Sequence, residues 1–201
     1  MTKWTDKEIK DESYDWQDLT GIEMERCSFL QCSFKGAVLT EATIERCTFE
    51  DCCFDEARMN AARLTDTSLA NCTFAHAYLF LATLKNCRLI GSSFADADLG
   101  GIVITGGDWS WSNLRHQKLA ELDLHGIKFV ETDLTSADLT KTNLSHTDLT
   151  RANLSNAKLV EADLRGAKFA GTDLRGANLK GCRMDMSQAI AFVQSLGAIV
   201  E

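Results

Sequence analysis

The chain has 201 residues, of which 29 are Asp or Glu and 21 are Lys or Arg, so its formal net charge is −8. Binding to phosphate needs basic patches, so this balance argues against direct binding to nucleic acid or to an anionic membrane. It permits a partner protein that is itself basic. The apolar fraction of 45% is ordinary for a folded protein, and the length suits one sizeable domain or two small ones.

The N-terminal segment, MTKWTDKEIKDESYDW, has no apolar centre and is not expected to be a signal peptide. No apolar run approaches the length of a transmembrane helix. We therefore expect a cytoplasmic protein. In that reducing compartment, the eight cysteines are not expected to form disulfides.

A large apolar residue recurs at every fifth position from Trp4 to Met184, which is 37 positions without a break. A small residue, usually Cys, Ala, Thr or Ser, lies two positions before most of them. A period of five fits neither an α-helix nor a β-strand. The distance along the chain from a small inward residue to the next large one is two, and from that large residue to the next small one it is three. This alternation instead indicates an extended segment followed by a corner. Four such units close a square coil of about twenty residues, and coils stack at about 4.8 Å.

The same pattern accounts for the glycines, cysteines and phenylalanines. Ten of the 13 glycines lie two residues after a large apolar residue, where a corner favours turn dihedrals. Seven cysteines occupy the small inward position, and Cys53 lies one residue later. Their spacing does not match a zinc cluster, so we interpret them as small buried apolar residues. Four phenylalanines spaced by twenty are expected to stack in the core: Phe34, Phe54, Phe74 and Phe94.

The repeat becomes irregular near 100–127, although its phase is kept. Bulky or polar residues such as Ile102, Gln117 and Leu122 occupy the small position there. A distorted coil, a joint between two coiled segments, or a loop of five or ten residues would each explain this. The outward Trp111 in this segment is a candidate apolar contact.

Negative charge is concentrated in the N-terminal half. Residues 1–100 hold 17 acids and 10 bases, whereas 101–201 hold 12 acids and 11 bases. A solvated acidic face and a face for a basic partner both remain open. Asn113, Asp133, Asn153 and Asp173 are spaced by twenty, so they form one line along the outside of successive coils. This line contains no basic residue. The candidate partner-facing acids are Glu50, Asp51, Asp55, Glu56, Asp98, Asp133, Asp138 and Asp173.

After Met184 the repeat stops, and the remainder predicts a helix that covers the last coil. Asp185 or Ser187 can cap its start, and Gly197 can end it. Residues 198–200 are then expected to form a short strand. Because the segment is apolar on more than one side, we expect it to form a homodimer through these residues: Ile190, Phe192, Val193, Leu196, Ile199 and Val200.

The stretches ADLTKTNLSHTDLTRANLS and ADLRGAKFAGTDLRGANLKG resemble the pentapeptide-repeat family, whose consensus is A(D/N)LXX. The resemblance implies an all-β fold, a right-handed quadrilateral β-helix. It would occupy residues 1–184, with a capping and dimerisation segment at 185–201.

The coil and its apolar tail further resemble the topoisomerase-protecting members of the MfpA and Qnr types. This resemblance implies a DNA mimic that binds a bacterial type II topoisomerase, DNA gyrase or topoisomerase IV. It would protect that enzyme from quinolones or peptide toxins. The unbroken phase is more similar to MfpA, since Qnr proteins often carry projecting loops. The alternative is a pentapeptide-repeat scaffold for an unrelated protein partner.

An enzymatic function is not expected. The histidines are scattered outside the inward positions, and no nucleophile–base pair, phosphate-binding loop or metal-ligand spacing occurs: His76, His116, His125 and His146. We therefore expect no catalytic residue, cofactor, metal or small-molecule substrate.

Overall fold

The computed structural model describes residues 2–195 and 197–200. The chain divides into two compact units, Met1–Asp108 and Trp109–Glu201. They are called the first and the second unit below. Each is a stack of square coils, and each coil takes twenty residues, because residues twenty apart pair between neighbouring turns. The expected quadrilateral β-helix is confirmed.

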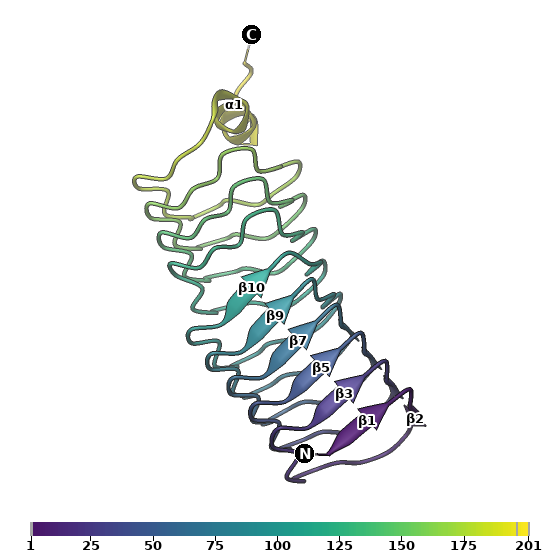
Figure 1. Ribbon diagram of the computed structural model, residues 1–201. Helices are drawn as coiled ribbons and strands as arrows, with labels where there is room; N and C mark the ends of the chain where they lie inside the picture. The colour runs from purple at the N-terminus through teal and green to yellow at the C-terminus, as the bar shows by residue number, and fades with distance from the viewer. Residues whose placement is uncertain (1, 196, 201) are drawn as a thin grey trace. The chain divides into compact units, whose positions relative to one another are not determined.

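The first unit contains the strands of the described chain, all three residues long and all paired in parallel. One sheet has the order β1-β3-β5-β7-β9-β10 (Figure 1). The other sheet has the order β2-β4-β6-β8. The strands are β1 (Lys3–Thr5), β2 (Glu8–Lys10), β3 (Glu23–Glu25), β4 (Ser28–Leu30), β5 (Thr43–Glu45), β6 (Thr48–Glu50), β7 (Arg63–Thr65), β8 (Ser68–Ala70), β9 (Thr83–Lys85) and β10 (Val103–Thr105).

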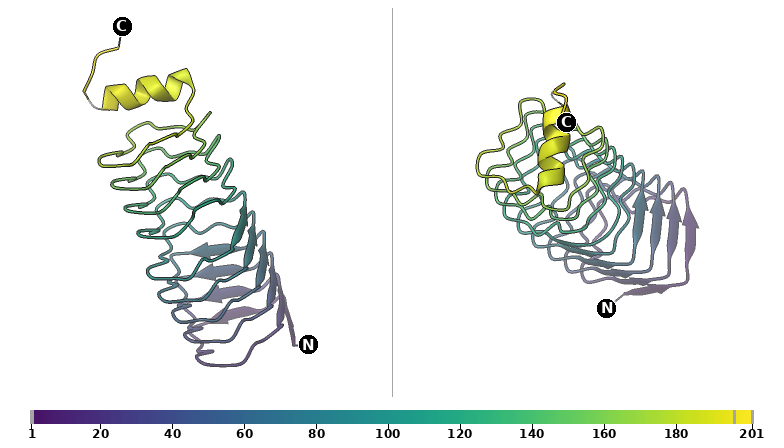
Figure 2. Two further views of the ribbon diagram at one scale, coloured as in Figure 1. Left: turned by 90° about the vertical axis from the view of Figure 1, so that its left-hand side faces the viewer. Right: turned by 90° about the horizontal axis from the view of Figure 1, so that it is seen from above.

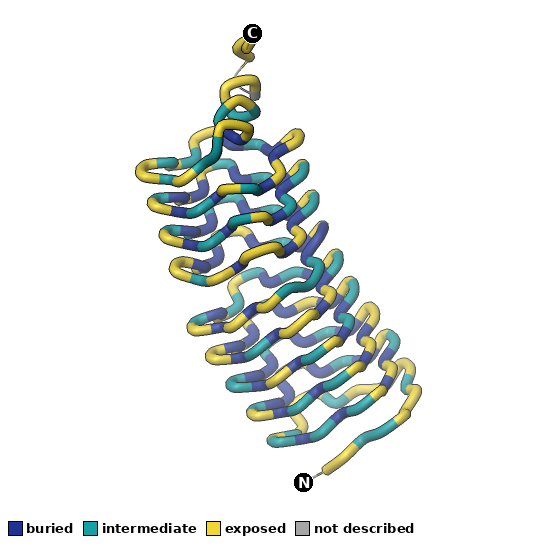
Figure 3. The backbone as a smooth tube through the Cα atoms, turned by 45° about the horizontal axis from the view of Figure 1, so that its top comes forward, coloured by how far each residue is buried: buried dark blue, intermediate teal, exposed yellow. Residues whose placement is uncertain are grey.

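The corners explain the period of five. Every fifth residue from Asp6 to Gly181 has a left-handed backbone, with φ between 49° and 72°. The four residues between corners turn one large side chain inward, as the alternation of buried and exposed positions along the tube shows (Figure 3). Most corners are not glycine. A left-handed backbone is unfavourable for such residues, so burial of the inward side chains must maintain it.

The inward phenylalanines form the predicted ladder. The ring centroids of Phe34 and Phe54 are 5.0 Å apart, those of Phe54 and Phe74 5.1 Å, and those of Phe74 and Phe94 4.7 Å. The interplanar angles are between 1° and 5°, so the rings stack face to face. A second stack joins Phe29 to the ring twenty residues later. The core of the first unit therefore contains two stacks of aromatic rings beside buried aliphatic side chains such as Leu39 and Ile44.

The cysteines are free thiols, and six of them are buried. The amide of Cys27 contacts the sulfur of Cys47 at 3.3 Å, so these two thiols, twenty residues apart, lie above one another. Burial raises the pKa of Cys47 and of Cys87 to about 11. Cys53 is half-buried, in agreement with its position outside the inward series. These thiols are packing groups in the core.

The second unit builds its coils from isolated parallel bridges rather than three-residue strands. The reason is the Asp or Asn of the repeat, whose side-chain oxygen accepts the amide hydrogen two residues later. Thr135 donates to Asp133 in this way at 3.0 Å, and Ser145 donates to Asn143 at 3.1 Å. Such turns tighten each corner and shorten the extended segment.

The irregular segment 100–127 contains the boundary between the units, which follows Asp108. On both sides of that boundary the left-handed corners keep their spacing of five, so the described residues hold no inserted loop. Gly107 departs from the pattern of corners. It has a positive φ of 104°, although it occupies an inward position and is not one of the corner residues.

The predicted C-terminal helix is α1 (Met186–Ser195), which lies across the last coil of the second unit (Figure 2). Asp185 rather than Ser187 caps it: the Asp185 carboxylate accepts the amide hydrogen of Gln188 at 3.2 Å, and the Gln188 side chain accepts that of Asp185 at 2.8 Å. Gly197, with φ 88°, ends it as predicted.

The short strand expected at 198–200 is wrong. These described residues have no strand pairing, and the side chain of Ile199 is 88% exposed. A strand needs a neighbouring edge that accepts and donates its backbone hydrogen bonds, and the segment leaves the helix without meeting one.

Candidate partner-binding surfaces

Charge is divided unequally between the two units. The first unit holds 18 acids and 10 bases, which gives −8. The second unit holds 11 of each, which gives zero. The whole net charge of the protein therefore belongs to the first unit, and a basic partner would be attracted to that unit.

Four of the candidate acids lie along one side of one coil of the first unit, at and beside its two corners Asp51 and Glu56: Glu50, Asp51, Asp55 and Glu56. We call them the acidic corner. Glu50 ends β6, and Asp51 occupies the left-handed corner that follows. Both side chains are exposed, whereas the next two residues of the set are half-buried.

The acidic corner has little compensating charge. Glu50 pairs with Leu30 on one side and with Ala70 on the other, and neither carries a charge. Lys35 forms an ion pair with Glu56 at 3.4 Å. No ion pair reaches Glu50, Asp51 or Asp55 from the residues that the structure describes. The four carboxylates thus carry about three uncompensated negative charges.

The other candidate acids are not part of this corner, and they are bound to their own backbone. Asp98, Asp133, Asp138 and Asp173 each accept the amide hydrogen two residues later, at 3.0 to 3.1 Å. Asp98 belongs to the first unit and the other three to the second.

The line of Asp133 and Asp173 is also compensated, which corrects the inference that no base accompanies it. Arg115 approaches Asp133 to 3.5 Å, and Arg175 approaches Asp173 to 2.6 Å. Arg175 lies two residues after Asp173, and Arg115 lies two residues after Asn113 in the neighbouring coil, so neither base occurs in the line itself. The hydrogen bond from Arg175 lowers the pKa of Asp173 well below its usual range.

Similar pairs neutralise the remaining faces of the second unit. Lys158 lies 3.2 Å from Asp138, and Lys168 lies 3.1 Å from Asp148. The hydroxyl of Thr140 and the ammonium of Lys158 lower the pKa of Asp138. The acids of the second unit therefore stabilise its corners and rungs.

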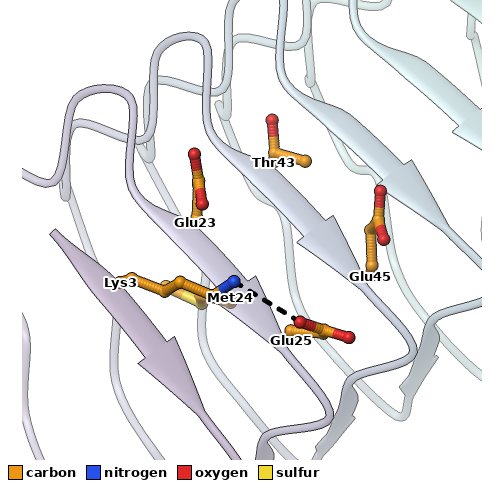
Figure 4. Close-up of a pocket in the computed structure, with 6 residues that line it drawn as sticks. All are labelled: Lys3, Glu23, Met24, Glu25, Thr43 and Glu45. Atoms are coloured by element: carbon orange, nitrogen blue, oxygen red, sulfur yellow. Dashed lines mark ion pairs between the residues drawn. The ribbon is translucent and has the colours of Figure 1, made fainter. Parts of the chain in front are cut away.

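A second acidic group, which the sequence analysis missed, lies on the sheet of β1, β3 and β5 (Figure 4). Glu23, Glu25 and Glu45 line a hollow of about 260 Å³ together with Lys3, Met24 and Thr43. The spacing of twenty between the second and third of these glutamates is the signal that could have revealed it.

Arginines bridge the turns in this group. Arg26 binds Asp6 at 2.6 Å, and Arg46 donates to Glu25 at 2.8 Å. Lys3 lies 3.5 Å from Glu25, as the dashed line in Figure 4 marks. The guanidinium of Arg26 lowers the pKa of Asp6. This group is an ion-pair network, so its charge is largely satisfied.

Trp111, the candidate apolar contact, is 56% exposed at a left-handed corner of the second unit. Exposed apolar residues also gather in the first unit, where Tyr78, Phe80, Leu81 and Val103 are each about half exposed. The sequence analysis did not include these four among the site residues. Their exposure follows from outward coil positions that are usually polar in this chain.

The helix α1 has one buried and one exposed side. Gln188 is buried and donates to the carbonyl of Ala167 at 3.2 Å, which attaches the helix to the last coil. Met186, Ile190 and Val193 are exposed and share one face at helical spacing.

The other predicted dimer residues are divided. Phe192 is half-buried, and Ile199 and Val200 are exposed beyond the helix. Leu196 lies outside the described residues. Beneath the helix, Leu179 and Met184 are only half-buried, whereas the leucines of earlier coils are fully buried. The helix therefore covers the last coil incompletely.

The described residues contain no cluster of His, Cys, Asp or Glu that could hold a metal ion. The rings of His125 and His146 lie 5.3 Å apart, and His125 shares a hydrogen bond of 2.9 Å with Ser145. In the described part of the chain, no helix has the length and apolar content needed to cross a membrane.

Two sequence-family models match the chain. The model described as "Pentapeptide repeats (8 copies)" matches residues 110–145, 118–156 and 147–185. The model described as "Pentapeptide repeat region" matches residues 22–99. Together they cover most of both units. The sequence matches no curated protein.

Solved structures with the same fold include a trypsin-treated variant of QnrB1, a plasmid-mediated fluoroquinolone resistance protein. It has a TM-score of 0.86 and 23% identity, and the alignment covers 99% of this chain and 100% of that chain. Full-length QnrB1 has a TM-score of 0.62 and 19% identity, with 98% and 100% covered.

HetL, a pentapeptide-repeat protein involved in heterocyst differentiation regulation in the cyanobacterium Nostoc sp. strain PCC 7120, has a TM-score of 0.52 and 26% identity. The alignment covers 91% of this chain and 89% of HetL. Since a resistance protein and a regulator of differentiation share this architecture, the likeness establishes the right-handed β-helix and leaves the partner to be decided by the surface.

Proposed function

This chain belongs to the pentapeptide-repeat family, and from that premise we propose that it is a DNA-mimicking protein that binds a bacterial type II topoisomerase. The partner is DNA gyrase or topoisomerase IV. The observation that carries the proposal is the concentration of the whole net charge of −8 on the first unit. The fold likeness to QnrB1, a fluoroquinolone resistance protein, supports the choice of partner.

The charge density of the first unit suits this role. Its 108 residues make about 5.4 coils of twenty, which at about 4.8 Å each rise by about 26 Å. Duplex DNA carries one charge per about 1.7 Å, or about 15 over that length. The first unit therefore carries about half the net charge of an equal length of DNA, held on a rigid backbone.

The mechanism follows from electrostatics. The DNA-binding surface of a topoisomerase is basic, and carboxylates of the acidic corner take the place of phosphates against it. A bound β-helix competes with DNA, so it reduces the number of enzyme–DNA complexes that a quinolone or a peptide toxin can trap. This role places the protein in the cytoplasm with its partner, and it requires no catalytic group.

Supercoiling and quinolone-induced cleavage by purified gyrase test the proposal. The wild-type protein should change one or both at micromolar concentration, and the variant Glu50→Gln/Asp51→Asn/Glu56→Gln should be weaker. The matched control, Glu121→Gln/Glu131→Gln/Glu161→Gln, removes three exposed acids from the second unit and should behave like the wild type. The proposal fails if the wild-type protein affects neither reaction.

The alternative function is a scaffold for an unrelated protein partner, as the likeness to HetL allows. The same charge variants distinguish the two. A protein that leaves gyrase and topoisomerase IV unaffected, yet is captured from its own cell extract by a partner that the acidic-corner variant does not bind, would favour the scaffold.

The proposed assembly is a homodimer through the C-terminal segment. The face of Met186, Ile190 and Val193, with Ile199 and Val200, leaves an apolar surface at the end of an incompletely covered coil. A second copy would bury it.

Val193→Asp tests the dimer better than a change at Phe192, because Phe192 is half-buried and its loss would also disturb helix packing. The control is Gln194→Asp, at an exposed position next to it. Light scattering should give a monomer for the first variant and a dimer for the second. A dimeric Val193→Asp protein would exclude this interface.

A further inference from the structure

The first coil of the first unit has one face against the second coil and one face that no coil of the described residues covers. β1 and β2, which belong to this coil, are the edge strands of their sheets. β1 lies at the N-terminal end of the stack (Figure 1). The inward residues here are only half-buried, whereas those of the second coil are fully buried: Trp4, Ile9, Tyr14 and Leu19. An open sheet edge beside a partly exposed apolar interior is a template on which another chain can stack.

The small inward positions of the first coil do not hold small residues. In the second coil these positions are small and buried: Cys27, Cys32 and Ala37. The residues twenty positions earlier are long, polar and exposed: Lys7, Glu12 and Gln17. We call these three side chains the end cap. Their backbone carbonyls still accept amide hydrogens from the second coil at 2.7 to 2.9 Å, so the register of the coil is kept and only the side chains differ.

The end cap lies over the open face of the coil. A long polar side chain cannot enter the interior, because large apolar residues fill it, so it remains on the outside. The ammonium of Lys7 lies 5.0 Å from the ring centroid of Trp4, which is an inward residue of the same coil. Lys7 and Glu12 also border a hollow of about 440 Å³ beside the inward side chains of Ile9 and Tyr14.

The aromatic ladder ends in a polar residue at the same face. Tyr14 stacks on Phe34 with ring centroids 5.0 Å apart and an interplanar angle of 16°, so it occupies the phenylalanine position of the following coils. Tyrosine adds a hydroxyl group to a half-buried ring, whereas the phenylalanines deeper in the ladder are buried. Polar groups thus concentrate where the coil would otherwise present an apolar end.

We infer that the end cap prevents self-association: Lys7, Glu12 and Gln17 block a second copy of this chain from stacking its own first coil on the open face. Two identical faces would otherwise place the same apolar rings and the same edge strands against each other, which is the condition for a two-fold contact. The inference concerns the first coil alone and does not depend on the topoisomerase partner.

The end cap also has a consequence for the proposed dimer. A copy that associated through its first coil as well as through its C-terminal segment would have two association surfaces, and copies with two such surfaces join into an open chain. Blocking the first coil limits the assembly to one interface.

Charge and cover can be separated at this face. Residues 1–20 hold six acids and three bases, so two first coils repel each other. Replacing Lys7, Glu12 and Gln17 together by alanine removes one acid and one base, so the net charge of the coil stays the same. A change in association then reports the loss of polar cover rather than a change in charge.

The test uses the full chain and the variant Lys7→Ala/Glu12→Ala/Gln17→Ala, since alanine already occupies such positions in later coils, as at Ala37. The matched control, Gln31→Ala/Glu41→Ala/Lys85→Ala, removes the same three residue types from exposed outward positions of later coils. Two of these are left-handed corners, where the protein already tolerates alanine at Ala61. Thermal unfolding monitored by circular dichroism checks that each variant is folded.

Sedimentation velocity measures the mass in about 1 M salt, where the Debye length of about 3 Å screens the repulsion between acidic ends. Protein concentrations run from about 1 to about 100 μM, the range in which a weak interface associates. The mass of the triple variant should rise with concentration to about twice that of the wild type, because two copies join at their first coils. The control should follow the wild type at every concentration.

A second variant separates stacking at this face from general aggregation. Lys7→Ala/Glu12→Ala/Gln17→Lys lowers the net negative charge of the coil, yet it restores one long side chain over the open face. Its mass should return towards that of the wild type. If it associates as strongly as the triple variant, a long polar side chain does not block the face and the inference is overturned.

A folded triple variant with the mass of the wild type at every concentration would also overturn the inference. Should the triple variant not fold, the pair Glu12→Ala/Gln17→Ala, which keeps Lys7 over Trp4, is measured in the same way. It should show a smaller rise in mass, and no rise at all would count against the end cap.

Discussion

Gly107 should be the most sensitive glycine of the first unit. It lies at an inward position with φ 104°, outside the left-handed region near φ 50° to 70° that other residues tolerate. A methyl group added there would lie 2.2 Å from the carbonyl oxygen of Cys87, which is backbone and buried. That oxygen also accepts the amide hydrogen of Asp108 at 3.0 Å.

The cost of Gly107→Ala follows from these contacts. Backbone strain contributes about 1 to 3 kcal/mol. Displacing the Cys87 carbonyl weakens a hydrogen bond of about 1 kcal/mol and overpacks the core by about 1 to 3 kcal/mol. The sum is about 5 kcal/mol, which is a large part of the stability of a domain.

Gly106→Ala is the control because it changes the adjacent residue. Its φ of 64° is that of an ordinary corner, and the nearest atom to a new methyl group is the flexible side-chain oxygen of Asn86 at 2.9 Å. We expect a cost of about 1 kcal/mol there. Urea unfolding followed by circular dichroism should therefore separate the variants by about 4 kcal/mol. Equal stability of the two would refute the steric argument.

Four further predictions concern the core, the thiols and the second unit. Phe54→Leu should destabilise by about 2 kcal/mol and Phe54→Ala by about 4 kcal/mol in urea unfolding, because Phe54 stacks on both neighbours; a neutral Phe54→Leu would contradict this. In the native protein, Ellman's reagent should modify Cys53 first, since burial raises the pKa of Cys47, Cys87 and Cys182 to about 11; rapid modification of several thiols would contradict it. Asp185→Ala should speed amide hydrogen exchange at Ser187 and Gln188, because it removes the side-chain oxygen that caps the helix. Asp185→Asn keeps a capping oxygen, so its exchange at these amides should be slower than in Asp185→Ala. Equal exchange rates in both variants would argue against the cap. Arg165 lowers the pKa of Asp163 to about 2, so the stabilisation from this carboxylate is present above about pH 4 and is lost as the pH falls towards 2. In Asp163→Asn, the midpoint of urea unfolding should therefore depend less on pH between about 4 and 2 than it does in the wild type. The same pH dependence in both proteins would show that Asp163 does not contribute to it.

The sequence predicted the coil because its cause is local. A large residue at every fifth position leaves one backbone that can bury them all, and the small position two residues earlier confirms the spacing. The stacks of Phe34, Phe54 and Phe74 and the free, buried cysteines follow from the same period. The cap and the end of the C-terminal helix were also predictable, since capping is decided by a few consecutive residues.

The candidate site was predicted only in part. Glu50 and Asp51 lie among neutral neighbours, which a spacing of twenty reveals in the sequence. Asp133 appeared to have no basic partner, because no base occupies the equivalent position in the neighbouring coils. Arg115 nevertheless reaches it from another position of the coil. Whether a long basic side chain turns towards one rung or another depends on its rotamer and on the neighbouring coils, which no periodicity encodes.

The sequence by itself determined the square coil, its buried residues and the acidic character of the N-terminal half, because each depends on residue type and spacing alone. The tertiary structure decided which charges remain uncompensated, which long side chains pair between coils, and which face of α1 is left exposed. The physical reason is that these properties arise between turns, where side chains twenty residues apart become neighbours and either pair or remain free for a partner.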